Sequence, residues 1–307
     1  MKRLYISLLL AGLLFSGCSD DFLDVDQTDK IPVDVEYLNT DTKATELVTS
    51  IYNQFLSWDM SSFGWNAVTS IISDDADKGS DPGDTGTDKD VIDALTYNAS
   101  TPSFESVWKA NYAGINRCNQ ALTYLPQLDK VTPALKNRLI GEAKFMRAFR
   151  YFTLVKGYGG VPIVDRLANT PLSEEDKVMQ LTRKTAAEVY AFIEKDLAEA
   201  AELLPEKGTY SGNDKQRVSK GSAYALLAKV SLYQKKWQEV IDNCDKVTGY
   251  SLVSDYSLQF KKEGEFGSES IFEINGVGSP TSDLKLGIGN YTVSQAPRGA
   301  GGWGWGF

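Results

Sequence analysis

The sequence predicts a mainly α-helical protein, built from helical hairpins and interrupted by long loop-rich insertions. Apolar residues recur at helical spacing in six stretches. One of these stretches, 133–156, is apolar on more than one face, so we expect a helix buried on several sides. Two regions, 58–102 and 276–307, lack this spacing. A chain of 307 residues with 42% hydrophobic residues is long enough for one large domain or two ordinary ones.

The first three predicted helices are well delimited. They cover 44–55, 104–125 and 133–156, and Pro126 ends the second. Thr132 and Pro133 provide an N-cap and a proline at the first helical position of the third helix. After it, the glycines between 157 and 160 permit unusual backbone conformations, and Pro162 prevents the helix from resuming.

The last three predicted helices lie between 185 and 247. Thr185 and Glu188 have the spacing of a capping box at the start of the fourth, which ends near 205. Ser219 opens the fifth, and a short turn leads to a sixth that carries Trp237. Together the fifth and sixth resemble a single tetratricopeptide repeat, in which the small Ala228 lets two helices approach and Trp237 fills the gap. Ordinary helix packing gives the same spacing.

The composition excludes several functions. The chain has no histidine, so Ser-His-Asp and Cys-His catalysis and histidine-ligated zinc are ruled out. The formal net charge of −9, without a basic run, argues against nucleic acid as a partner. We expect no cofactor.

The N-terminus predicts export. Residues 1–17 contain two basic residues and a short apolar run, which is typical of a cleaved signal peptide and too short for a membrane span. Cys18 then stands at a lipoprotein processing site, so we expect a lipid anchor on it that holds the mature protein on a membrane surface. A plain signal peptide followed by an incidental thiol is the alternative.

Four internal residues are expected to be structural. Cys118 and Cys244 each fall on the apolar stripe of a predicted helix, which favours buried free thiols over a disulfide between them. Arg147 and Arg150 are expected to bind acidic residues of neighbouring helices rather than a ligand.

Three segments resemble the SusD/RagB-type nutrient-uptake lipoproteins of the outer membrane: 18–24, 142–162 and 217–233. The resemblance implies tetratricopeptide-like helix pairs, with a loop-rich region that bears the ligand site. It also implies attachment to the outer membrane facing the exterior, an oligosaccharide ligand and a SusC-like, TonB-dependent transporter as partner. Family members are usually longer, so residues 18–275 are expected to form the helical region, and 276–307 the start of a truncated C-terminal region.

Aromatic residues in the loop-rich regions are the candidate sugar contacts. Flat aromatic faces pack against the C–H surfaces of sugars, and amides bind the hydroxyl groups. Ordinary packing is the alternative for each of them. The candidates are Trp58, Trp65 and Asn66 in the region 58–102, and Trp303 and Trp305 near the end of the chain.

A metal site and an enzymatic activity are both less favoured. The acidic run 74–84 resembles a calcium loop, but counted from Asp75 the positions for the required glycine and glutamate hold Ser80 and Gly86. We therefore expect a solvated acidic loop without metal. The predicted function is capture of oligosaccharide without catalysis. The alternatives are a tetratricopeptide-type scaffold that binds proteins, and an uptake component for peptides.

Overall fold

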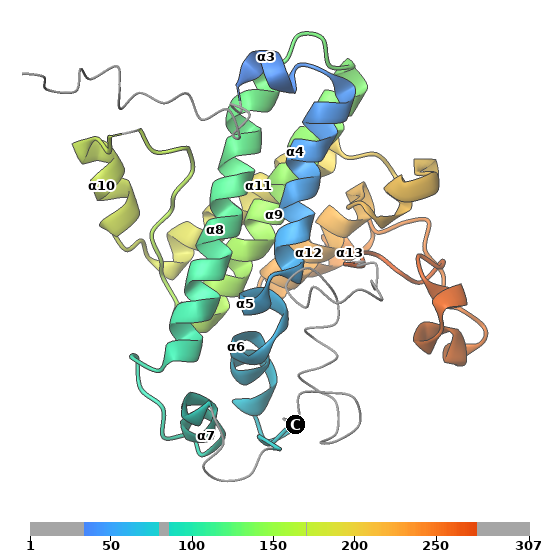
Figure 1. Cartoon of the computed structure of the whole chain (residues 1–307). Coiled ribbons are helices and arrows are strands. Elements are labelled where there is room, and N and C mark those ends of the chain that lie inside the picture. The colour runs from blue at the N-terminus through green and yellow to red at the C-terminus, as the bar shows by residue number, and fades with distance from the viewer. Residues whose placement is uncertain (1–33, 80–85, 170, 275–307) are drawn as a thin grey trace, which may run out of the picture.

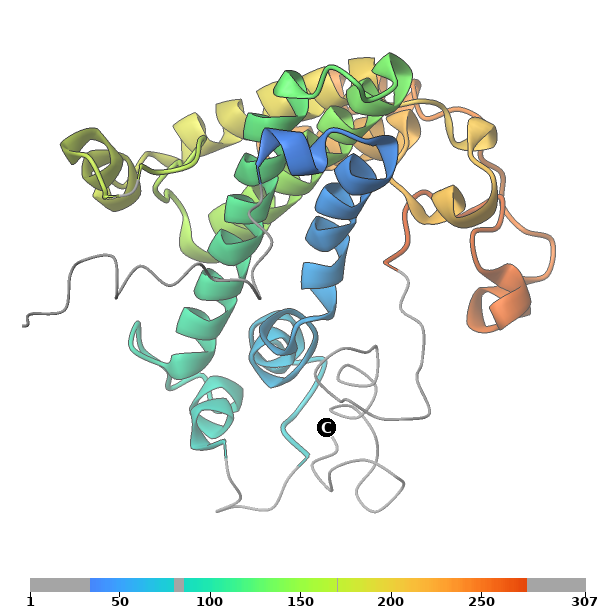
Figure 2. The ribbon, with the colours of Figure 1, turned by 45° about the horizontal axis from the view of Figure 1, so that its top comes forward.

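The computed structural model describes residues 34–79, 86–169 and 171–274, and these ranges are helical, without a strand. Figure 1 shows the long helices side by side, and Figure 2 shows the same bundle turned forward. The helices are α3 (Val35–Leu38), α4 (Asp41–Asn53), α5 (Trp58–Ser61), α6 (Phe63–Asn66), α7 (Thr87–Asp93), α8 (Pro102–Tyr124), α9 (Pro133–Tyr158), α10 (Glu174–Leu181), α11 (Ala186–Leu203), α12 (Lys220–Tyr233) and α13 (Trp237–Cys244). A π-helical turn, η2 (Ala67–Ile71), and the 3₁₀ turns η1 (Gln54–Leu56), η3 (Leu125–Gln127), η4 (Lys207–Thr209), η5 (Gly212–Gln216), η6 (Tyr256–Phe260) and η7 (Lys262–Gly264) complete the set.

Helix α9 is the centre of the bundle. It packs against α4, α8 and α11, while α12 lies against α11 and α13 against α12. Leu139, Met146 and Leu154, spread along α9, are fully buried. The prediction of a helix buried on several sides is confirmed. Helix α10 stands apart from the bundle in both views. No helix within the described ranges is both long and apolar enough to cross a membrane.

The predicted helix starts are confirmed, but the Thr132 side chain does not form the cap that we expected. The Thr185 hydroxyl accepts a hydrogen bond from the Glu188 amide at 3.2 Å, and the Glu188 carboxylate accepts one from the Thr185 amide at 2.8 Å. Thr132 stands at the N-cap of α9, but its side chain caps nothing there. Instead, its hydroxyl donates to Asp41 at 2.7 Å, which ties the starts of α4 and α9 together.

The segment 58–102, which we predicted to be loop-like, contains α5, α6, η2 and α7. This part of the prediction needs correction. Helices α5 and α6 have four residues each, so they are too short to show a helical repeat in the sequence. They form because both pack against α8. In Figure 1 the short helices lie at one end of α8.

The hairpin of α12 and α13 forms as expected, but two of its side chains do not lie where we predicted. Ala228 is buried, whereas Trp237 is 60% exposed and fills no gap between the two helices. Cys118 is a buried free thiol, and Cys244 is free but exposed. The prediction of a buried Cys244 is wrong because no residue of α13 is buried. An apolar stripe is buried only where another element covers it.

Candidate functional site

The two arginines of α9 that we expected to bind acidic residues differ sharply. Arg147 holds Asp196 of α11 through two hydrogen bonds of 2.7 and 2.8 Å, as predicted. Arg150 is fully buried, and its three guanidinium nitrogens have no hydrogen-bond partner within the described ranges. Its guanidinium lies 4.3 Å from the ring centre of Phe55, so a cation–π contact replaces the predicted ion pair. Burial lowers the pKa of Arg150 to about 10.

The first group of predicted sugar contacts lies on α5 and α6. Trp58 begins α5, is 37% exposed and meets the ring of Phe63 edge-on at 5.2 Å. Trp65 is half-buried against the main core. Asn66 ends α6 and is 2% exposed, so its side chain belongs to the packing of α6. Of the three, Trp65 lies on the wall of a hollow.

We call this cavity the Trp65 hollow. It has a volume of about 260 Å³ and lies between α6 and η2 on one side and the facing ends of α8 and α9 on the other. Gly157 leaves it open, since a β-carbon added there would meet no atom within 4 Å. The ten residues that line it are Trp65, Val68, Thr69, Ile72, Phe104, Val107, Thr153, Lys156, Gly157 and Tyr158.

The aromatic walls of the Trp65 hollow are fixed in place. The Tyr158 hydroxyl donates to the carbonyl oxygen of Phe104 at 2.6 Å, which links the end of α9 to the start of α8. Burial raises the pKa of Tyr158 to about 12, so the hydroxyl stays protonated. The hydroxyl of Thr69 donates to the carbonyl oxygen of Trp65 at 2.8 Å, which leaves its oxygen able to accept a further hydrogen bond.

Lys156 is the charged residue among those that line the Trp65 hollow, but its ammonium lies against Phe152 and Tyr233, which do not line it. Its ammonium lies 4.6 Å from the ring centre of Phe152 and 5.7 Å from that of Tyr233. Partial burial, and to a lesser degree the nearby Lys229, lowers the pKa of Lys156. The hollow therefore combines aromatic faces with a few polar groups, the chemistry that sugar recognition needs.

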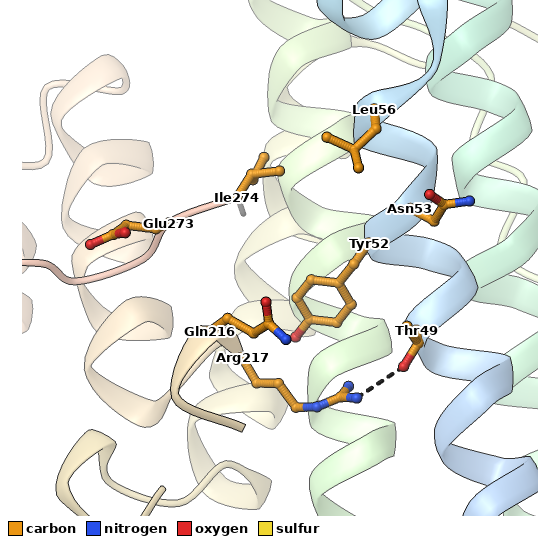
Figure 3. Close-up of a pocket in the computed structure, with 8 residues that line it drawn as sticks. All are labelled: Thr49, Tyr52, Asn53, Leu56, Gln216, Arg217, Glu273 and Ile274. Carbon is orange, nitrogen blue, oxygen red and sulfur yellow. Dashed lines mark hydrogen bonds between the residues drawn. The ribbon is translucent and has the colours of Figure 1, made fainter. Parts of the chain in front are cut away.

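A second cavity, which we call the Tyr52 pocket, lies between α4, the end of η5 and the last described residues (Figure 3). Its volume is about 160 Å³. This pocket was not predicted from the sequence, because its walls come from three distant parts of the chain. The eight residues that line it are Thr49, Tyr52, Asn53, Leu56, Gln216, Arg217, Glu273 and Ile274.

A buried charge network lies beneath the Tyr52 pocket. The Glu142 carboxylate, fully buried on α9, accepts hydrogen bonds of 2.9 Å from the Tyr52 hydroxyl and from the Arg217 guanidinium. Arg217 also donates to Asp214 and to Thr49, each at 2.9 Å. These contacts join α4, α9 and the segment before α12. Burial opposes the charge on Arg217, but Glu142 keeps its pKa above the usual range.

Two sets of sequence-predicted residues lie outside the described ranges. These are Cys18, and Trp303 and Trp305. In the acidic run, Asp74, Asp75 and Asp77 are exposed. Where the structure describes the chain, it contains no group of three or more His, Cys, Asp or Glu residues that could hold a metal ion.

The fold is that of known SusD-like proteins. A SusD-like carbohydrate-binding protein from Bacteroides fragilis matches with a TM-score of 0.71 at 22% identity, covering 88% of this chain and 52% of that one. A laminarin-binding SusD-like protein matches at 29% identity and a TM-score of 0.64, over 75% of this chain and 50% of that one. Surface glycan-binding protein A from Bacteroides thetaiotaomicron, in complex with laminarihexaose, matches at 25% identity and a TM-score of 0.66, over 81% of this chain and 53% of that one.

Comparison of the sequence with known proteins also identifies SusD-like relatives. Residues 21–232 match the SusD-like family described as "Starch-binding associating with outer membrane", and the chain belongs to it. A SusD-like protein of Bacteroides ovatus is 25% identical over 90% of this chain and 50% of its own length. SusD-like protein P2 of Formosa agariphila is 27% identical over 84% of this chain and 48% of its own length. The chain thus spans about half the length of these relatives.

Proposed function

We propose that this protein binds oligosaccharide at the Trp65 hollow and releases it unchanged. The observation that carries the proposal is the hollow itself, in which Trp65, Phe104 and Tyr158 offer aromatic surface beside hydroxyl groups. Two similar proteins of known structure support the ligand class, because one is named as binding laminarin and the other is in complex with laminarihexaose. Trp58 is proposed as a contact at the edge of this region, and Trp303 and Trp305 as further ones.

The proposal also says that the bound oligosaccharide is not hydrolysed. Glycoside hydrolysis generally needs two carboxyl groups on either side of the bond that is cleaved. None of the described residues that line the Trp65 hollow is an aspartate or a glutamate. We therefore propose capture rather than hydrolysis. A long incubation with laminarihexaose that released shorter sugars would contradict this.

The test of the site is calorimetric titration of the protein with laminarihexaose. Trp65→Ala removes an aromatic anchor and is expected to weaken binding by about tenfold or more. Trp237→Ala is the matched control, because Trp237 is 60% exposed on α13 and does not line the hollow. Equal affinities for the two variants would remove the Trp65 hollow from the proposal.

Location and partner complete the proposed function. The family description places its members with the outer membrane, and we propose that a lipid on Cys18 holds this protein there, facing the exterior. From that position it would deliver the sugar to a TonB-dependent transporter. Radiolabelled palmitate should label the protein in cells, and Cys18→Ser should abolish both the label and the membrane association. Co-purification of a large β-barrel protein from solubilised membranes tests the transporter.

Binding of proteins instead of sugars is the other function that one observation favours. The hairpin of α12 and α13 forms, and Trp237 and Ile241 on its outer helix are more than half exposed. No heat from any glycan, together with a protein partner that Trp237→Ala releases, would favour this second function.

A further inference from the structure

The Tyr52 pocket has the features of a second binding site, separate from the Trp65 hollow. The two cavities share no lining residue. In Figure 3 the ring of Tyr52 lies between the aliphatic side chain of Leu56 and the guanidinium of Arg217, with Ile274 on the opposite wall. An aromatic ring faced by aliphatic side chains forms a slot suited to a small ring with C–H surfaces.

The walls of the Tyr52 pocket are held rigidly before any ligand binds. The Tyr52 hydroxyl donates to Glu142 at 2.9 Å and accepts from the Val218 amide at 3.2 Å, which fixes the ring. The Arg217 guanidinium lies 5.5 Å from the Tyr52 ring centre and is held by Glu142, Asp214 and Thr49. A ligand that enters such a site costs little ordering entropy.

Polar groups remain available at the Tyr52 pocket. Each nitrogen of Arg217 makes one hydrogen bond, so each terminal nitrogen keeps one further N–H group. The Gln216 side chain extends toward Tyr52, and its amide bonds to none of the other residues drawn (Figure 3). These groups can donate hydrogen bonds to hydroxyl oxygens, and the Gln216 carbonyl can accept one.

The charges around the Tyr52 pocket favour a neutral ligand. Beneath it, the guanidinium groups of Arg138 and Arg217 are balanced by the carboxylates of Glu142 and Asp214. The Glu273 carboxylate accepts from the Phe266 amide at 2.9 Å and points away from Tyr52 in Figure 3. No surplus positive charge is left to compensate an anion.

We propose that the Tyr52 pocket binds one neutral sugar ring, such as an end residue of an oligosaccharide. Its volume of about 160 Å³ is too small for a longer chain. The proposal shares the ligand class of the proposed function but does not depend on the Trp65 hollow. The protein would then hold sugar at two places.

Protein NMR with laminarihexaose tests this second site. We expect saturable shifts of the backbone amides of Asn53, Leu56 and Gln216, both in the wild type and in Trp65→Ala. Gln216→Ala should weaken this binding by about fivefold, since it removes hydrogen bonds to the ligand. Gln180→Ala on α10 is the matched control and should leave it unchanged. Glucose should shift the same amides, and glucuronate should shift them less.

The outcomes separate the two sites. Shifts near Asn53 that survive Trp65→Ala but are weakened by Gln216→Ala support the Tyr52 pocket, even if the Trp65 hollow fails. Shifts confined to the Trp65 hollow, or shifts near Asn53 that Gln216→Ala and Gln180→Ala leave equally intact, overturn the second site. Glucuronate that binds as well as glucose overturns the assignment of a neutral ligand.

Discussion

The middle of α9 and its end use their side chains in opposite ways. In the middle part, the carboxylate of Glu142 is buried and bonded to Tyr52 and Arg217, and Arg147 is bonded to Asp196. At its end, Lys156 makes no ion pair within the described ranges, and Gly157 faces open space. Polar side chains that make their hydrogen bonds within the protein stabilise the fold. Side chains that no other element covers remain available to a ligand. Tyr52 and Arg217 do both, because they also form the wall of a cavity.

The strongest test of this comparison uses the two arginines near the middle of α9. Arg147→Met removes both hydrogen bonds that Arg147 makes to the buried carboxylate of Asp196, which keeps only Lys144 at 3.6 Å, so we expect a loss of about 3 kcal/mol in the free energy of unfolding. Arg150→Met removes a buried cation that has no hydrogen-bonding partner, so we expect a change within about 1 kcal/mol, of either sign. Chemical denaturation measures both. A loss for Arg150→Met as large as that for Arg147→Met would show that Arg150 is paired after all.

A smaller effect is expected where Arg150 meets α8. A β-carbon added at Gly114 would lie 2.1 Å from the Arg150 guanidinium carbon, so Gly114→Ala must displace that side chain. We expect a loss of about 1 to 3 kcal/mol from overpacking. In the double variant with Arg150→Met the loss should shrink, because methionine adapts its shape to the space available. Thermal unfolding of the single and double variants measures the coupling, and additive effects would contradict it.

The smallest expected effect concerns α10, which stands outside the bundle. The Asp176 carboxylate is buried, which raises its pKa, but hydrogen bonds from Ser173 and Asn169 and the guanidinium of Arg166 outweigh this and hold the pKa well below 3.8. A group whose pKa is lowered in the folded state contributes stability above its unfolded pKa, and that contribution is lost as the pH falls. We therefore expect lower protection factors for the amides of α10, that is, exchange rates corrected for their intrinsic pH dependence, below about pH 4 than at pH 7. In Asp176→Asn the protection factors should depend less on pH in this range. Identical pH profiles would contradict the assignment.

Much of the fold was predictable from the sequence, because long helices repeat their apolar spacing over many turns. The capping box of Thr185 and Glu188 was predictable because the two residues lie three positions apart in the sequence, and it forms as predicted. The exposure of Trp237 and Cys244 was not predictable, since it depends on what covers α13. The lack of a hydrogen-bond partner for Arg150 within the described ranges was not predictable either, because it depends on tertiary packing. The sequence shows that a residue is charged and lies on a helix, but not what faces it.

The candidate site was only partly predictable. Trp65 was identified because an aromatic residue in a region without clear periodicity is a plausible ligand contact, and it lines a hollow. The other walls, such as Phe104 and Tyr158, come from helices that meet only in the folded protein. The Tyr52 pocket was missed because Tyr52 and Arg217 lie far apart in the sequence. Glu142 and Arg217 do lie in segments that resemble the SusD/RagB family, but that resemblance did not reveal their contact.

The most direct test of the central claim, that the open end of α9 binds sugar, is to fill the Trp65 hollow without disturbing the core. Gly157→Leu places a side chain in that space. Gly208→Leu is the matched control, because a β-carbon at Gly208 also meets no atom within 4 Å and Gly208 lies in η4, outside the hollow. Titration with laminarihexaose should show affinity at the Trp65 hollow reduced by about tenfold or more for Gly157→Leu and unchanged for Gly208→Leu. Wild-type affinity in a correctly folded Gly157→Leu protein would contradict the account.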